Sequence, residues 1–114
     1  MKALISACAM LACMIPVAAT AQTVNDDVRC LLLSSGYARV AKDDTSRRAA
    51  MMTGAFYLGR LDGRVSKPAL TAAIRAQGKG LPAKEAQTVM RTCAARAAAA
   101  EQQTSAAGKP AGAK

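Results

Sequence analysis

The chain has 114 residues, with 16 Lys and Arg against 7 Asp and Glu, a formal net charge of +9, and no histidine. This length supports one domain, and the lack of histidine removes the commonest metal ligand and the commonest general base. One Phe, two Tyr and no Trp leave few aromatic side chains for stacking on bases, so nucleic acid is not an expected partner.

The first 21 residues form a predicted signal peptide. Residues 3–19 are almost entirely apolar, and an A-x-A cleavage site ends at Ala21. We expect cleavage there and a periplasmic or secreted protein without a transmembrane segment. One alternative is a retained membrane anchor, although the apolar run of about 17 residues is at the lower limit for spanning and Pro16 interrupts it. The other is a lipoprotein cut before Cys8.

The processed chain opens with a predicted helix. Asn25 or Asp26 can cap its start, and residues 42–44 form the turn after it. The apolar face expected for this helix consists of Cys30, Leu33, Tyr37 and Val40, which recur at helical spacing.

Residues 47–63 are predicted to form the central helix of the domain. Placed on a helix, they are apolar on nearly every side, which is typical of a helix wrapped by others. A cap among residues 44–46 starts this helix, and the turn after Asp62 ends it. We interpret Gly54 and Gly59 as positions where a neighbouring helix comes close.

Two further helices are predicted. Ser66 and Pro68 begin a short third helix, and Gly78 ends it. The last helix follows Pro82, and its apolar stripe consists of Ala86, Val89, Met90, Cys93, Ala97 and Ala100. Residues 102–114 carry no large apolar side chain and are expected to be a disordered tail. The sequence therefore predicts an all-α, four-helix domain over residues 22–101.

Two cysteines, Cys30 and Cys93, remain once the leader is removed. An even count in a small exported chain indicates a disulfide. Each lies in the apolar stripe of its helix, so the bond would join the first and last helices. Closing so long a loop contributes roughly 4 kcal/mol in the chain-entropy model, which matters for a fold of about 80 residues. The alternative is a pair of free thiols.

We predict no catalytic, cofactor-binding or metal site. The acidic pairs at 26–27 and 43–44 are interpreted as helix-start and turn residues. The sequence holds no P-loop, dinucleotide-binding, haem-attachment or calcium-loop motif. The methionines at 51, 52 and 90 are interpreted as core residues rather than copper ligands.

The basic excess is interpreted mainly as a solvated surface. Its most distinctive part is Arg60, Asp62 and Arg64, which flank the end of the central helix. They are a candidate contact for an anion or a partner. The interpretation that we favour over this contact is an ion-paired helix end in which Asp62 pairs with either arginine.

The segments D-V-R-C-L-L-L (27–33), Y-L-G-R-L-D-G-R (57–64) and T-C-A-x-R (92–96), together with the signal peptide, resemble small exported, uncharacterised proteins of alphaproteobacteria. In size, helicity and single disulfide the chain also resembles periplasmic acid-stress chaperones. We expect a non-catalytic periplasmic interaction or holdase-like module acting on client proteins. The alternative is a cationic protein that binds anionic lipid or polysaccharide of the envelope.

Overall fold

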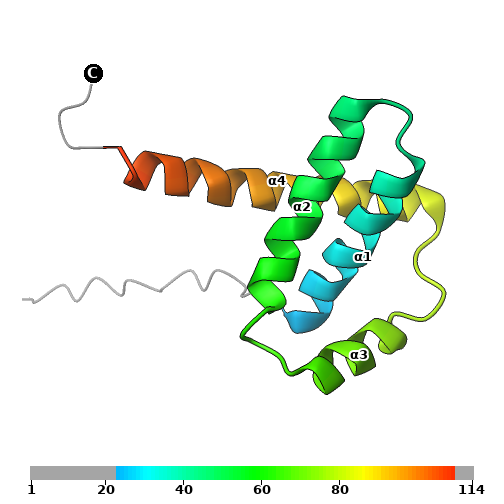
Figure 1. The fold of residues 1–114 in the computed structure, drawn as a ribbon. Helices are drawn as coiled ribbons and strands as arrows, with labels where there is room; N and C mark the ends of the chain where they lie inside the picture. The colour runs from blue at the N-terminus through cyan, green and yellow to red at the C-terminus, as the bar shows by residue number, and fades with distance from the viewer. Residues whose placement is uncertain (1–22, 110–114) are drawn as a thin grey trace, which may run out of the picture.

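In the computed structural model, residues 23–109 are described, and they fold into helices joined by short loops (Figure 1). The helices are α1 (Val24–Val40), α2 (Asp44–Leu61), α3 (Lys67–Ala76) and α4 (Ala83–Ala107). No β-strand occurs among residues 23–109. The predicted all-α, four-helix fold is confirmed. The predicted signal peptide, residues 1–21, lies outside the described residues.

Side chains that precede the helices cap their first turns. Thr23 Oγ1 accepts a hydrogen bond from the backbone N–H of Asp26 (3.2 Å), and Asp26 Oδ2 accepts one from the backbone N–H of Thr23 (3.2 Å). Asp43 Oδ1 accepts one from the backbone N–H of Ser46 (2.7 Å) at α2. Both helices begin slightly earlier than predicted because these acceptors lie just ahead of them. Ser66 caps α3 as predicted.

The α1 and α2 helices run side by side in opposite directions and form the body of the fold (Figure 1). They approach closely where Ser34 faces Gly54, since a Cβ atom on Gly54 would lie 3.4 Å from Ser34 Cβ. The Ser34 hydroxyl is satisfied because it donates to the carbonyl oxygen of Cys30 (2.7 Å). The predicted close approach is therefore confirmed at Gly54, whereas a Cβ on Gly59 would have no described neighbour within 4 Å.

The buried face of α1 differs from the predicted one. It consists of Asp27, Val28, Cys30 and Ser34, while Val40 is 72% exposed. Because α2 packs against the side that carries the small Ser34, the contact is rotated away from the larger apolar residues.

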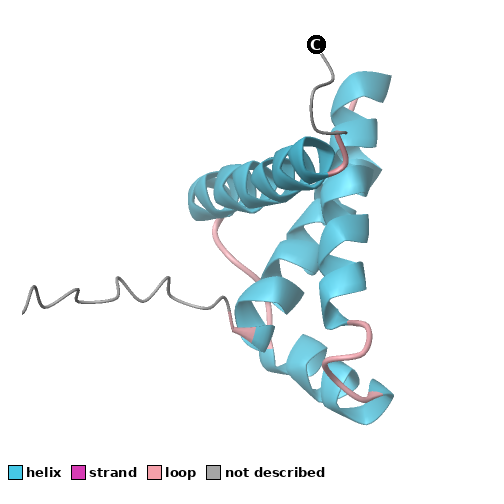
Figure 2. Ribbon diagram, turned by 90° about the vertical axis from the view of Figure 1, so that its left-hand side faces the viewer, coloured by secondary structure: helices cyan, strands magenta, loops and turns pink. Residues whose placement is uncertain are grey.

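The prediction that other helices wrap α2 is wrong. One side of α2 buries Tyr57 and Leu61, but Met51, Met52 and Leu58 on the other side are 60%, 55% and 50% exposed. The short α3 lies along α1 instead, and α4 crosses α2 over a limited stretch (Figures 1 and 2).

The α3 helix contributes no buried residue to the fold. It is held near the start of α1 by Gln77, whose Oε1 accepts from Arg29 Nε (3.4 Å) and whose Nε2 donates to the carbonyl oxygen of Asn25 (3.3 Å). None of the described helices combines the length and the hydropathy needed to cross a bilayer.

The α4 helix crosses the α1–α2 pair, and its second half extends away from it (Figures 1 and 2). Cys93, near its middle, is the buried residue that α4 contributes. The helix continues to Ala107, so residues 102–107 are helical where we expected a disordered tail to begin. Alanine and glutamine have high helix propensity, which explains this extension without tertiary contacts. Residues 110–114 lie outside the described part.

Candidate functional site

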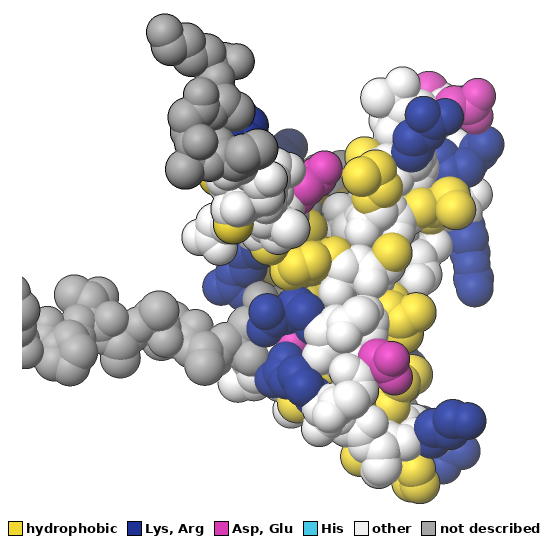
Figure 3. Space-filling view, turned by 60° about the vertical axis from the view of Figure 1, so that its left-hand side comes forward, with side chains coloured by type: hydrophobic (Ala, Val, Ile, Leu, Met, Phe, Trp, Pro, Cys, Tyr) yellow, Lys and Arg dark blue, Asp and Glu magenta, His cyan; other side chains and the backbone are white. Residues whose placement is uncertain are grey.

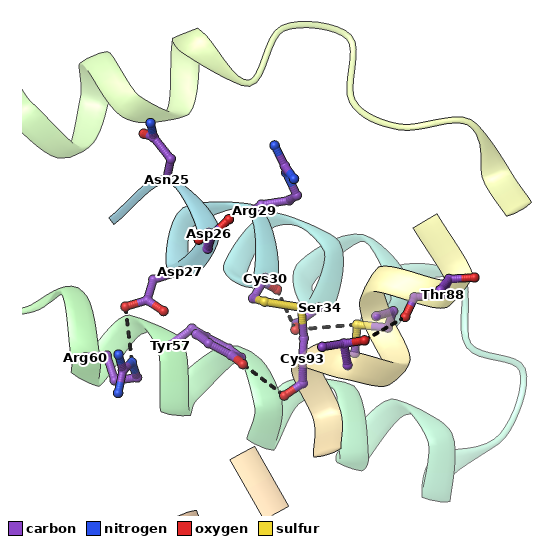
Figure 4. The surroundings of a disulfide bond; sticks show 12 residues. Asn25, Asp26, Asp27, Arg29, Cys30, Ser34, Tyr57, Arg60, Thr88 and Cys93 are labelled. Atoms are coloured by element: carbon purple, nitrogen blue, oxygen red, sulfur yellow. Dashed lines mark hydrogen bonds and ion pairs between the residues drawn. A yellow bond between two sulfur atoms is a disulfide. The ribbon is translucent and has the colours of Figure 1, made fainter. Parts of the chain in front are cut away.

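The disulfide predicted from the sequence is confirmed and lies where three helices meet (Figure 4). Cys30 of α1 and Cys93 of α4 have their Cα atoms 5.5 Å apart. Tyr57 of α2 is fully buried beside them, and its hydroxyl donates to the carbonyl oxygen of Cys93 (3.0 Å). The partly buried side chains packed around this cluster are Leu31, Phe56 and Val89. The disulfide is therefore itself the centre of the apolar core.

An ion cluster joins the first turn of α1 to the end of α2. The carboxylate of Asp27 is fully buried, and its Oδ2 accepts from Arg60 Nε (3.1 Å) and from Arg64 Nη1 (2.5 Å). Figure 4 shows Asp27 and Arg60 facing each other. Of the predicted candidate group, the two arginines are brought together. Asp62 instead lies at the C-terminal cap of α2, exposed and without an ion pair to any residue in the described range.

The role of Asp27 was missed because it looked like a helix-start residue. Asp26 fills that role in the capping box, which leaves Asp27 free for another. A helix brings residues three positions apart to the same face, so Asp27 shares the face of Cys30. An acidic residue beside a core cysteine is the sequence signal that could have predicted a buried ion pair.

The ion cluster holds more positive than negative charge. Two guanidinium groups share one oxygen of Asp27, and the other oxygen, Oδ1, is buried without a described hydrogen-bond partner. The side chains of Arg60 and Arg64 remain 38% and 41% exposed. Arg60 also lies 5.7 Å from the centroid of the Phe56 ring, within the range of a cation–π contact. The cluster ties α1 to α2 and presents surplus positive charge to solvent.

Two carboxyl groups have shifted pKa values, and both belong to helix caps. The hydroxyl of Thr23 donates to Asp26 and lowers its pKa, while the backbone N–H of Ser46 lowers the pKa of Asp43. These shifts mark helix starts rather than a reacting centre. In the part of the chain that the structure describes, no group of three or more His, Cys, Asp or Glu side chains is placed to hold a metal ion.

Exposed apolar side chains lie along α2 (Figure 3). We call its exposed side the outer face of α2; it consists of Arg48, Met51, Met52, Ala55, Leu58, Gly59 and Asp62, all exposed. Beside it, α2 and the second half of α4 border an open hollow of about 540 Å³, which we call the α2–α4 groove. Its lining includes Met52 and Phe56 from α2 and Ala94, Ala97, Ala98 and Glu101 from α4.

Comparison of the chain with protein-family models, with curated proteins and with solved structures found no match.

Proposed function

We propose that the protein is a non-catalytic interaction module that holds apolar segments of client proteins in the α2–α4 groove, in the manner of a holdase. The observation that supports this most is the groove itself, which is lined by Met52, Phe56 and alanines of α4 and open to solvent. Apolar surface left open in this way is typical of sites that bind other chains.

The lining suits clients of varied shape. Methionine is unbranched and adapts to irregular surfaces, so Met52 can adjust to different side chains. The alanines of α4 let a bound segment approach the helix closely, because their side chains are short. The volume of about 540 Å³ accommodates a few apolar side chains. Their burial stabilises the complex by about 25 cal/mol for each Å² of apolar surface removed from water.

We propose the periplasm or the cell exterior as its location. The disulfide between Cys30 and Cys93 fits an oxidising compartment, and the predicted leader directs export. A single buried covalent link also suits a holdase, because α4, one wall of the groove, stays attached while weaker contacts around it open.

The test is suppression of client aggregation, followed by light scattering of citrate synthase as it unfolds on heating. Ala98→Glu places a charge inside the groove, whereas Ala95→Glu places the same charge at an exposed position of α4 outside the lining. Wild type and Ala95→Glu should suppress scattering, and Ala98→Glu should lose most of this effect. Circular dichroism checks that both variants are folded. Failure of the wild type, or equal activity of the two variants, would refute the proposal.

A second candidate function is binding to anionic components of the envelope. Arg60 and Arg64 favour it, because they converge on one carboxylate and leave surplus positive charge at the surface. Co-sedimentation with phosphatidylglycerol vesicles tests it. Binding that falls steeply with added salt and is absent with neutral phosphatidylcholine vesicles would support it; equal binding to both vesicles would contradict it.

A further inference from the structure

The outer face of α2 has an internal symmetry about Ala55. Met52 and Leu58 lie three residues to either side of it, and Met51 and Gly59 lie four residues to either side. Arg48 and Asp62 lie seven residues away, so a basic residue stands at one end and an acidic residue at the other. All these positions are exposed.

This symmetry makes the face complementary to itself. We propose that it is the interface of a homodimer, in which α2 packs antiparallel against α2 of a second copy with the two-fold axis at Ala55. Met52 would then face the partner's Leu58, and Arg48 would face the partner's Asp62. A two-fold axis repeats both contacts, so two apolar pairs are flanked by two ion pairs.

The charge distribution favours a second copy over an anionic membrane. The chain carries +9, so two copies repel each other over most of their surface. On the outer face Arg48 and Asp62 balance, and Arg47 beside it is paired with Asp44 (3.1 Å). Like-charged molecules approach with least repulsion where their facing surfaces are neutral. Binding an anionic lipid surface would instead require an excess of cations here.

Gly59 supports the same arrangement. Glycine inside a helix is unfavourable relative to alanine. Apart from the chain neighbours of Gly59 and the nearby backbone of α2, no described atom lies within 4 Å of the position that a Cβ on Gly59 would occupy. In the dimer, the partner's Met51 lies opposite Gly59 and fills that space. Ala55 on the axis also lets the two helices approach closely, because its side chain is small.

The contact is short, so the dimer should be weak. The face from Arg48 to Asp62 is about 21 Å long at 1.5 Å per residue. A single helix pair of this length buries less than a stable dimer needs, which predicts a dissociation constant of about 10 to 100 μM. At submicromolar concentrations the protein should be a monomer.

Sedimentation equilibrium tests whether the protein dimerises. The sample is the protein purified in the form that the expressing cells produce, at about 1 to 500 μM, a range that brackets the expected dissociation constant. Ala55→Arg brings two like charges together on the axis and should raise the dissociation constant about a hundredfold. Ala95→Arg adds the same side chain to exposed α4 surface and should leave it unchanged. A wild type that stays monomeric throughout, or an Ala55→Arg variant that dimerises normally, would overturn the proposal.

Charge reversal tests the antiparallel pairing. Arg48→Asp and Asp62→Arg should each weaken the dimer about tenfold at low salt, since each sets like charges opposite one another twice. The double variant should regain wild-type affinity, and failure to do so would refute the pairing. The dimer does not depend on the proposed function, because Ala98→Glu should abolish client protection and leave dimerisation intact.

Discussion

Removal of the disulfide should release α4 from the rest of the protein. The α3 helix buries no residue, and among the described side chains of α4 only Cys93 is buried. Cys93 is held by its bond to Cys30 and by the hydroxyl of Tyr57. The α1–α2 pair has contacts of its own, at Gly54 and around Asp27. Reduction therefore removes the main attachment of α4 and leaves the contacts between α1 and α2 in place.

The stability lost on reduction follows from the sequence separation of 63 between Cys30 and Cys93. In the chain-entropy model, closing a loop of that length stabilises the folded state by about 4 kcal/mol. The free energy of unfolding of a domain this small is about 5 kcal/mol. The reduced protein should therefore retain only a small part of this free energy. In urea, with a slope of about 1 kcal/mol per M for a chain of this size, the unfolding midpoint should fall by about 4 M.

The assay is urea unfolding followed by far-ultraviolet circular dichroism, with and without reductant. The double variant Cys30→Ser, Cys93→Ser is the control, since it should match the reduced wild type and not respond to reductant. Amide hydrogen exchange should show that α4 loses protection while α1 and α2 retain some. A midpoint shift below about 1 M, or simultaneous loss of protection in all the helices, would refute the reasoning that the disulfide anchors α4.

Three other perturbations probe the core and the caps. Asp27→Asn removes the charge that holds two arginines and should lower the free energy of unfolding by about 2 kcal/mol, a buried-pair loss discounted because both guanidinium groups are partly exposed. In the same urea titration, Asp62→Asn should change the free energy of unfolding by less than about 0.5 kcal/mol. Equal effects of the two substitutions would contradict a special role for Asp27. Tyr57→Phe removes the hydroxyl that donates to the backbone carbonyl oxygen of Cys93 and should lower the free energy of unfolding by about 1 kcal/mol. An unchanged midpoint would show that this hydrogen bond adds nothing. Because the folded state lowers the pKa of Asp26, its stabilising contribution is present above the unfolded pKa near pH 4 and is lost as pH falls through the lower folded value. Thermal unfolding should therefore show a gap between wild type and Thr23→Ala that is larger at neutral pH than in strong acid. A smaller gap should remain in acid, because Thr23→Ala also removes the bond from the backbone N–H of Asp26 to Thr23 Oγ1, which does not titrate. A gap of equal size at both pH values would count against this linkage.

The features that the sequence predicts correctly are set locally. Helical periodicity and capping residues determine the helices, and the positions of Cys30 and Cys93 in two apolar stripes indicate their pairing. What could not be predicted depends on how the helices are arranged. The buried face of α1 follows from which side meets α2, and the burial of Asp27 depends on arginines far along the chain.

The open surface of α2 could not be predicted for a related reason. Apolar residues on every side of a helix indicate that something covers each side, but they do not say whether the cover belongs to the same chain. In this fold α1 covers one side, and Met51, Met52 and Leu58 remain exposed on the other. The prediction of a fully wrapped helix fails because the pattern shows where apolar side chains lie around α2 and not how much of that surface its neighbours reach.

The position of Cys93 explains why the groove stays open. It lies near the middle of α4, so the disulfide fixes the centre of that helix against α1, and the Tyr57 hydroxyl fixes the same point against α2. A straight helix held at its centre and crossing its neighbours diverges from them on both sides of that point. The second half of α4 therefore leaves α2 at an angle, and the space between them is the groove. A cysteine nearer the C-terminal end of α4 would pull that half toward α2 and close the groove. One covalent link therefore both stabilises this small fold and keeps the α2–α4 groove accessible.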